Sequence, residues 1–404
     1  MIERGLERIE GGITAPLGFR AAGVACGIKV KGGLDLSLLA SDGLSAAAGV
    51  FTTNRAVAAP VLLSREHLRR SGGRAAAVVI NSGCANACTG DQGEQVAASM
   101  AAGTARALSV APEHVLVAST GVIGVALDAR KVARGIRDAA RALRRDGHED
   151  AARAIMTTDP FPKSHAAATI IDGTTVRVGG MAKGAGMIEP LMATMLGVVT
   201  TDAAIEPTLL QRALADAVAQ SFNAITVDGE CSTNDCVFLL ASGASGVTIG
   251  PGEYAAFVAA LTDVCRALAV DIVRGGEGAT KLVTVTVRGA ASVADARRAA
   301  RAICNSPLVK TAVHGGDPNW GRLVAVAGRA GVAFELSKAA VRIGAVELFA
   351  AGRPYDDRAP KAAEHLRGTD VSLEVDLGSG HETARMWTCD LSAEYVRINA
   401  EYRT

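Results

Sequence analysis

The chain has 404 residues, 49% of them hydrophobic and 21% charged, which predicts a globular protein of two or three packed units and argues against long disordered tails. Its 42 basic and 41 acidic residues leave a formal net charge of +1, so there is no global field to attract a nucleic acid or an anionic membrane. Aromatic residues make up only 3%, and the core must therefore consist mostly of Ala, Val, Leu and Ile.

The first predicted elements form a strand–loop–helix unit, and the same order then recurs. Residues 76–80 (AAVVI) are an apolar run typical of a buried strand, and a turn-rich loop leads from them into a helix predicted from about 91 to 108. Residues 114–120 (HVLVAST) predict a second strand. Asp128 is a candidate N-cap for the next helix, whose apolar side chains share one face.

The middle of the chain predicts a hairpin, a strand and two long helices. Residues 165–187 are extended, with a hairpin turn expected at Asp172–Gly173, and the strand GVVTTD follows from residue 197. Pro207 suits the first turn of a helix whose apolar residues recur at every fourth position, and residues 257–272 repeat that pattern. Both helices are expected to face the core.

The last third of the chain continues the alternation of strands and helices. A strand is predicted at 281–287, a helix from Ser292 to about Cys304, and a further strand at 371–378. Ser292 and Asp295 resemble a capping box at the start of that helix. The elements together predict an α/β fold with mixed sheets covered by helices in layers.

The eight cysteines do not have the spacing of a metal site. No two of them form the CxxC half-site of a zinc centre, and Cys84/Cys88 and Cys231/Cys236 are the closest pairs. We interpret them as reduced thiols that act as small hydrophobic side chains in a cytoplasmic protein. No metal is therefore expected.

Neither a secretory signal nor a membrane span is expected. The first 19 residues are rich in charge and lack the apolar segment of a signal peptide. The most apolar stretch, around residue 195, is interrupted by Glu189, Pro190 and Asp202, far short of the roughly 20 residues that a span requires.

Common catalytic motifs are missing from the chain. There is no GxSxG elbow and no HExxH, and GGMAKGAG lacks the spacing of a phosphate-binding loop. What remains is a glycine-rich segment holding Lys183, with Thr194 after it between small or apolar neighbours. Taken alone, that threonine is typical of a β-branched residue in a buried strand.

Longer motifs change this interpretation of Thr194. In order along nearly the whole chain, the sequence resembles the ornithine acetyltransferase family, the bifunctional glutamate N-acetyltransferases of arginine synthesis. The motifs that carry the resemblance are NSGCANACTG (81–90), ASTGVIG (118–124), AIMTTD (154–159), GGMAKGAGMIEPLMATML (179–196), STNDC (232–236), GEGATK (276–281), SPLVKTAVHGGDPNWGR (306–322) and INAEYRT (398–404).

The resemblance implies that the chain cuts itself between Ala193 and Thr194. The products would be an α chain of residues 1–193 and a β chain of residues 194–404, which stay associated as a cytoplasmic α2β2 assembly. The implied fold is the layered αββα type of self-cleaving acetyltransferases and aminopeptidases.

The chemistry explains why position 194 needs a side-chain nucleophile. The hydroxyl of Thr194 can attack the preceding carbonyl to form an ester, which water then hydrolyses. Cleavage frees the α-amino group of Thr194, whose reference pKa of about 7.7–8.0 lets it act as base to its own hydroxyl, without a histidine, metal or cofactor. The implied reaction is ping-pong transfer of acetyl from N2-acetylornithine to glutamate, and use of acetyl-CoA as a second donor is left open.

The remaining site residues follow from the family motifs. The resemblance places the oxyanion hole at Thr120 and Gly121, where a hydroxyl and a backbone N–H can point at one oxygen. For Lys183 and Glu277, a structural ion pair or a solvated charge is the alternative to substrate binding. The implied substrate contacts are Thr157, Lys183, Thr194, Glu277, Asn399 and Thr404.

Two further features are assigned to structure. The polar and aromatic cluster in HGGDPNWGR, from His314 to Arg322, is interpreted as a structured turn near the site. Cys84 stands where the family often has asparagine, which concerns the loop after residue 81 and not the nucleophile.

Two other functions are compatible with these residues. An N-terminal-nucleophile aminopeptidase or amidase would share the cleavage and the nucleophile, but would give the acyl group to water. An uncut amino-acid-binding protein would keep the pocket without the reaction.

Overall fold

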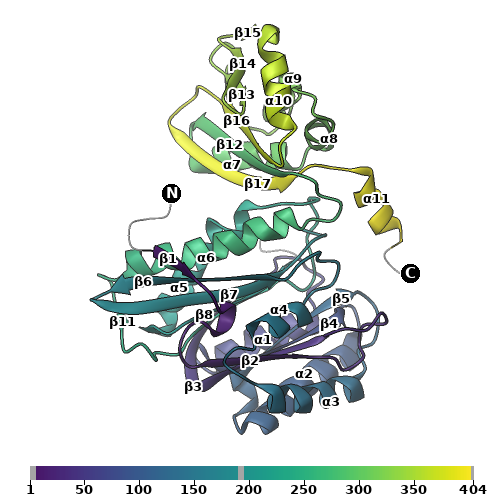
Figure 1. Cartoon of the computed structure of the whole chain (residues 1–404), viewed down its shortest axis with the longest axis vertical. Coiled ribbons are helices and arrows are strands. Elements are labelled where there is room, and N and C mark those ends of the chain that lie inside the picture. The colour runs from purple at the N-terminus through teal and green to yellow at the C-terminus, as the bar shows by residue number, and fades with distance from the viewer. Residues whose placement is uncertain (1–5, 190–194, 402–404) are drawn as a thin grey trace. The chain divides into compact units, whose positions relative to one another are not determined.

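The computed structural model describes residues 6–189 and 195–401, and the chain divides into two compact units. The first unit comprises Met1–Asn223 and Glu230–Ile272, and the second comprises Ala224–Gly229 and Val273–Thr404. Each unit has its own mixed sheet covered by helices (Figure 1), which confirms the predicted α/β class. The predicted chains 1–193 and 194–404 are covalent divisions, distinct from these compact units, and stay a prediction.

Nine strands in the described part of the first unit form one mixed sheet, in the order β1-β6-β7-β8-β10-β3-β4-β5, with β2 paired to β3 outside this path. The β4–β5 and β8–β10 pairs are parallel, and the other pairs are antiparallel. The strands are β1 Leu6–Ile9, β2 Phe19–Val24, β3 Leu36–Phe51, β4 Arg74–Cys84, β5 Val115–Val122, β6 Lys163–Ile171, β7 Thr174–Lys183, β8 Leu196–Thr201 and β10 Cys236–Ala241. A short parallel pair joins β9 Ala204–Ile205 to β11 Thr248–Ile249.

Two helices of the first unit, α3 and α5, begin where the sequence predicts. The Asp128 side chain accepts hydrogen bonds from the backbone N–H groups of Arg130 and Lys131 at 2.9 and 3.2 Å, and Pro207 is the first residue of its helix. The helices are α1 Ala59–Arg70, α2 Gly90–Leu108, α3 Ala129–Ala142, α4 His148–Ala154, α5 Pro207–Ala219 and α6 Tyr254–Arg274, with short 3-10 turns at η1 Gly12–Thr14, η2 Pro112–His114 and η3 Phe222–Ala224.

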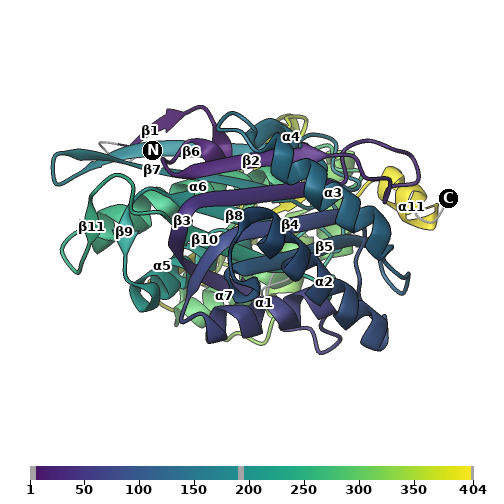
Figure 2. The ribbon, with the colours of Figure 1, turned by 90° about the horizontal axis from the view of Figure 1, so that it is seen from below.

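Strands β3, β4 and β5 are buried on both faces. Helices α1, α2 and α3 cover their outer face (Figure 2), where Val79 and Val117 pack with side chains of α2 and α3. The residues between them on each strand, including Val78 and Leu116, point to the opposite face of the sheet. They belong to a second cluster of buried side chains, which we call the inner cluster. Burial on both faces explains why AAVVI is an uninterrupted apolar run and does not alternate with polar residues.

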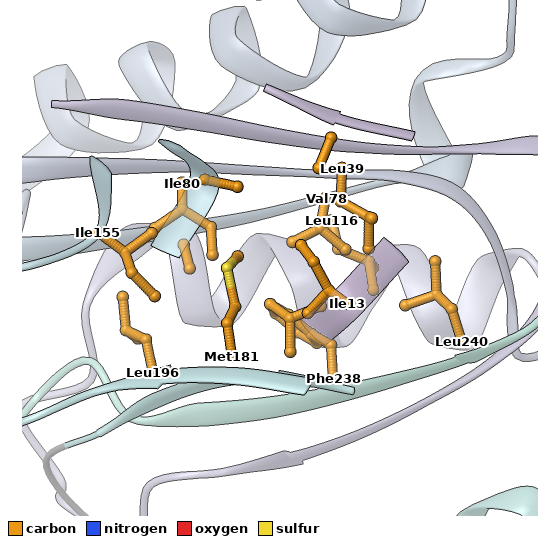
Figure 3. Close-up of a cluster of buried hydrophobic side chains, with 14 of the residues drawn as sticks. Ile13, Leu39, Val78, Ile80, Leu116, Ile155, Met181, Leu196, Phe238 and Leu240 are labelled. Atoms are coloured by element: carbon orange, nitrogen blue, oxygen red, sulfur yellow. The ribbon is translucent and has the colours of Figure 1, made fainter. Parts of the chain in front are cut away.

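The inner cluster brings two parts of the same sheet face to face. In Figure 3, Leu39, Val78 and Leu116 from β3, β4 and β5 lie opposite Leu196 and Phe238 from β8 and β10. The sheet therefore closes over itself, so that strands distant in its order meet across the core.

Strand alternation then places two site residues on this inner side. Leu116 and Met181 both belong to the inner cluster. Since side chains on a strand alternate between faces, Thr120, four residues after Leu116, and Lys183, two residues after Met181, point to the same side. Both residues come close to the ends of their strands, where the apolar core gives way to polar groups.

In the second unit, as far as the chain is described, six strands form a mixed sheet in the order β15-β14-β13-β16-β12-β17, with only β12–β16 parallel. The predicted cap is confirmed, because the Ser292 hydroxyl accepts from the Asp295 N–H at 3.1 Å. The strands are β12 Leu282–Ala290, β13 Ala340–Ile343, β14 Val346–Ala350, β15 Arg353–Pro354, β16 Asp370–Asp376 and β17 Glu382–Cys389. The helices are α7 Val293–Cys304, α8 Pro307–Gly315, α9 Trp320–Gly328, η4 Asp356–Arg358, α10 Ala359–Leu366 and α11 Ala393–Ala400.

Replacing Phe238 with alanine should test the inner cluster. The side chain is 0% exposed and packs edge-on against Phe51 with ring centroids 6.0 Å apart. Phe238→Ala should lower the free energy of unfolding by about 3–5 kcal/mol, because it leaves a cavity between the two halves of the sheet. Urea denaturation measures the loss. Ile170→Ala, at a side chain that is 60% exposed, is the matched control, and an equal loss in both variants would contradict this description of the core.

Candidate functional site

Thr120 and Lys183 meet across the inner side of the first unit. Lys183 Nζ donates a hydrogen bond to Thr120 Oγ1 at 3.2 Å, and both side chains are buried. Lys183 is the last residue of β7 and Thr120 lies near the end of β5. The structure thus joins two of the predicted site residues, which are 63 positions apart in the chain.

Gly121 has a backbone that only glycine accommodates. Its φ of +132° lies in the region that L side chains rarely adopt, and a Cβ there would stand 2.3 Å from the carbonyl carbon of Gly83 and 2.5 Å from Cys84 N. Gly83 is its partner in the β4–β5 ladder. This close approach of the two backbones constrains the course of the chain next to Thr120.

Cys84, the predicted departure from the family, has a structural part in this loop. It is buried, and its Sγ donates to the carbonyl of Val125 at 3.2 Å. Burial raises the pKa of the Cys84 thiol, so this sulfur is not an activated nucleophile. All eight cysteines of the chain are free thiols.

Asp159 is the charge that organises Lys183. It is buried, and it accepts hydrogen bonds from the backbone N–H of Thr157 at 2.9 Å, from Gly184 N at 2.7 Å and from Lys163 Nζ at 2.6 Å. Burial alone would raise the pKa of the Asp159 carboxyl, but the charges of Lys183 and Lys163 and these hydrogen bonds outweigh it and lower that pKa to about 2. Asp159 is therefore ionised and holds Thr157 and the start of the loop after Lys183 in place.

The predicted cleavage site, Ala193 and Thr194, lies outside the described residues, but both of its flanks are anchored. Glu189 N donates to the carbonyl of Glu230 at 2.8 Å, and Cys236 N donates to the carbonyl of Met195 at 3.2 Å. The same segment, Glu230–Cys236, thus holds the chain on either side of residues 190–194. At the start of β8, Leu196 pairs with Lys183 of β7.

Glu277 and Asn399 meet within the second unit. Asn399 Nδ2 donates to Glu277 Oε2 at 2.9 Å, and the Glu277 side chain is buried. Next to Glu277, Gly278 has a φ of +68°, and a Cβ there would lie 2.4 Å from the backbone nitrogen of Tyr395. The glycine therefore lets the first turn of α11 approach the loop that carries Glu277. Thr404 lies beyond the described residues.

A buried aspartate fixes the loop that carries Glu277. Asp390 accepts from the backbone N–H groups of Thr280 and Lys281 at 2.8 and 2.9 Å. Lys281 Nζ in turn donates to the carbonyls of Val313 and Leu366, at the C-terminal ends of α8 and α10, at 2.7 and 2.6 Å. The lysine of GEGATK is thus structural.

The HGGDPNWGR cluster is built into the second unit by its own contacts. His314 Nδ1 lies 2.6 Å from Asp390 Oδ2, and the Trp320 ring stacks on Phe349 with centroids 4.9 Å apart. Arg322 donates to the carbonyl of Leu308 at 2.6 Å. These contacts fit the predicted scaffolding role.

Sequence reasoning missed three residues that organise these sites: Asp159, Asp390 and Asn234, which donates to the carbonyls of Ser119 and Ala85. Asp159 ends the motif AIMTTD and Asn234 lies in STNDC, so the motifs marked the segments without indicating which side chain mattered. No signal in the sequence marks Asp390. In residues 6–189 and 195–401, no three His, Cys, Asp or Glu side chains gather as a metal site would require, and no helix among them is long and apolar enough to cross a membrane.

Comparison with known proteins finds similarity over almost the whole chain. The model of the ArgJ family matches residues 20–404. The arginine biosynthesis bifunctional protein ArgJ of Symbiobacterium thermophilum is 52% identical over 404 residues, which cover 99% of this chain and 100% of that protein. The protein of the same name from Gloeobacter violaceus is 47% identical over 98% of this chain and 99% of its own length. The crystal structure of arginine biosynthesis bifunctional protein argJ from Bacillus halodurans is 42% identical, with a TM-score of 0.50, over 51% of this chain and 99% of the solved chain.

Replacing Asp159 with asparagine should change how stability depends on pH. The folded-state pKa of about 2 lies below the ordinary value, so the carboxylate stabilises the fold above about pH 4 and loses this effect as the pH falls through 2. Asp159→Asn should cost about 3–5 kcal/mol at neutral pH, since the buried ammonium of Lys163 loses its ion-pair partner and Lys183 loses a nearby negative charge.

The difference in unfolding free energy between wild type and Asp159→Asn should shrink by roughly 2 kcal/mol between pH 4 and pH 2. Denaturant titrations across that range measure it. Asp146→Asn, at a side chain that is 84% exposed, should change stability little at any of these pH values. A difference for Asp159→Asn that does not vary with pH would show that the carboxylate is not the stabilising species.

Proposed function

We propose that this chain, which belongs to the ArgJ family, transfers the acetyl group of N2-acetylornithine to glutamate through an acetyl ester on Thr194. Membership of the family makes it an acyltransferase enzyme of arginine biosynthesis. The proposal of an acetyl ester on Thr194 rests on the Lys183–Thr120 contact at the end of the inner core. Lys183 also pairs with Leu196, two residues after Thr194, so the contact involves a strand next to the one that follows the proposed nucleophile.

The proposed maturation is a cut between Ala193 and Thr194. The hydroxyl of Thr194 attacks the carbonyl of Ala193, the peptide nitrogen leaves as the new α-amino group, and water hydrolyses the ester. The solved chain from Bacillus halodurans matches 51% of this chain over 99% of its own length. A separate chain of about half the length supports this step, because a cut before Thr194 would divide the protein near its middle.

Acetyl transfer then proceeds in two similar half-reactions. The free amine of Thr194 takes the hydroxyl proton as the oxygen attacks the acetyl carbonyl, and the tetrahedral intermediate collapses to release ornithine. The amine of glutamate attacks the ester in the same way and leaves as N-acetylglutamate. The relatives' name "bifunctional" supports a second acetyl donor, for which we propose acetyl-CoA.

The Thr120–Gly121 pair suits the oxyanion of both halves. Because the Thr120 oxygen accepts a hydrogen bond from Lys183, its own proton can be directed at the substrate oxygen. The Gly121 N–H supplies a second donor, and the ammonium of Lys183 adds positive charge behind the first. These donors are arranged before substrate arrives.

Other residues are proposed to select the amino-acid substrates. The buried carboxylate of Glu277 suits the side-chain ammonium of ornithine, and Asn399, already bonded to it, can add a polar contact. Thr157 and Lys183 suit a carboxylate or carbonyl oxygen. Thr404 completes the proposed set.

The proposed α and β chains are held together by the sheet of the first unit. Strands β8 and β10 belong to the β chain, yet they lie between β7 and β3 of the α chain. Cleavage would leave these ladders intact, which supports association after the cut, and we propose that pairs of such heterodimers form α2β2. The free thiols support the proposed cytoplasmic location.

Replacing Thr194 with alanine should abolish both the cut and the transfer. On a denaturing gel, wild type should give two bands of about half the mass each, and Thr194→Ala one band near 41.1 kDa. Thr208→Ala, on the exposed start of α5, is the control and should be cut like wild type. A single wild-type band would support the uncut binding protein instead.

The acceptor distinguishes the transferase from a hydrolase. Wild type is incubated with N2-acetylornithine labelled in the acetyl group, with and without glutamate, and intact mass is used to detect acetylated β chain. Label in N-acetylglutamate supports the proposal. Label found only in free acetate would identify an amidase of the same nucleophile class.

Replacing Thr120 with valine should slow the chemical step. The valine keeps the shape of the side chain but removes one oxyanion donor, which lowers kcat by about a hundredfold or more. Thr104→Val is the matched control: the Thr104 hydroxyl is buried in α2 without a hydrogen-bond partner in the part of the chain described. Steady-state rates per cleaved chain measure the effect, and a kcat equal in both variants would remove Thr120 from the mechanism.

A further inference from the structure

Asn234 connects the segment beside the proposed nucleophile to the strand that carries the oxyanion donors. Its Nδ2 donates to the carbonyl of Ser119 at 2.9 Å and to the carbonyl of Ala85 at 2.6 Å. Ser119 directly precedes Thr120 in β5, and Ala85 directly follows β4. Because both acceptors are carbonyl oxygens, the amide has one orientation that satisfies them.

The Asn234 amide is held on its other side as well. The Thr233 hydroxyl donates to the side-chain oxygen Oδ1 of Asn234 at 2.6 Å. The backbone N–H of Asn234 donates to the Ser232 hydroxyl at 3.1 Å. The side chain is 5% exposed. A buried amide with all of these bonds formed cannot rotate without breaking several of them, so it is a rigid spacer.

The segment that carries Asn234 also holds the chain on both sides of residues 190–194. Glu230 O binds Glu189 N, and Cys236 N binds Met195 O. One short segment therefore contacts both flanks of the proposed cleavage site and, through Asn234, the residue before Thr120. A shift of this amide would move the Thr120–Gly121 donors relative to β8.

We propose that Asn234 is a positioning residue for acetyl transfer, which sets the Thr120–Gly121 oxyanion donors in register with the strand that follows Thr194. This inference rests on the proposed function. Asn234 acts through Ser119 and does not contact the substrate. Loss of its two donated bonds misplaces the donors, and a displacement near 1 Å is enough to cost about a hundredfold in rate.

The chain offers a matched buried asparagine. Asn86 is also buried, its Nδ2 donates to the carbonyl of Gly93 at 2.9 Å, and its Oδ1 accepts from the Thr89 hydroxyl at 2.9 Å. It thus has the same kinds of partner as Asn234, but it is bonded to the start of α2 and not to β5. In both positions an aspartate keeps the shape and loses donors.

The test compares Asn234→Asp with Asn86→Asp, at temperatures equally far below the Tm of each. We expect kcat per cleaved chain to fall about a hundredfold in Asn234→Asp and by less than about threefold in Asn86→Asp. The KM for N2-acetylornithine should be unchanged in both, because the oxyanion exists only during the reaction. Cleaved fractions are measured on denaturing gels.

A milder pair of substitutions tests the proposal even if the aspartate variants do not fold. Thr233→Val removes the hydroxyl that fixes the Asn234 amide, and Thr89→Val removes its counterpart at Asn86. Thr233→Val should lower kcat about tenfold and Thr89→Val should not. In a Thr120→Val background, the effect of Thr233→Val should be smaller, since one of the two donors that Asn234 positions is already missing.

The outcomes separate the two proposals. If wild type moves no acetyl group to glutamate, the proposed function fails. If wild type is active but Thr233→Val loses no more kcat than Thr89→Val, or its loss adds fully to that of Thr120→Val, Asn234 has only a structural role and this inference alone is overturned.

Discussion

The arrangement in the first unit depends on one buried carboxylate. Asp159 lies among two lysines and two backbone N–H groups, and its negative charge offsets the positive charges of Lys183 and Lys163. An unpaired buried ammonium loses its proton or draws in water. Asp159, which belongs to a different loop, therefore lowers the cost of burying the charge of Lys183 beside Thr120.

The second requirement is an environment that excludes water, and the sheet supplies it because it folds over on itself. Strands β5 and β7 are not neighbours in the sheet, and they meet only because the inner cluster joins the two halves across a packed apolar layer. Polar groups at the edge of such a layer interact more strongly than they would in water. The apolar core thus positions Thr120 and Lys183 and also strengthens the interaction between them.

Local signals were enough to predict much of the fold, whereas contacts between distant segments were not. Asp128, Pro207 and Ser292 marked helix starts because a cap acts on its own next few residues. Strand β3, by contrast, is rich in alanine, serine and glycine and has no clear pattern in the sequence, since the faces it buries are set by its neighbours. The family motifs predicted Thr120, Lys183, Glu277 and Asn399 as site residues, and their roles stay a proposal. They did not reveal Asn234, because its contacts join residues 115 and 149 positions apart, and nothing within STNDC encodes such partners.

The positive charge behind Thr120 also suits the proposed acetyl transfer. The ammonium of Lys183 donates to the Thr120 hydroxyl, so positive charge lies next to the two proposed oxyanion donors, Thr120 and Gly121. A neutral carbonyl gains little from that charge, whereas the oxyanion of a tetrahedral intermediate gains a great deal, and only such a difference accelerates a reaction. We propose that Lys183 behind Thr120 favours the transition state, while the negative charge of Asp159 makes the buried lysines less costly to keep.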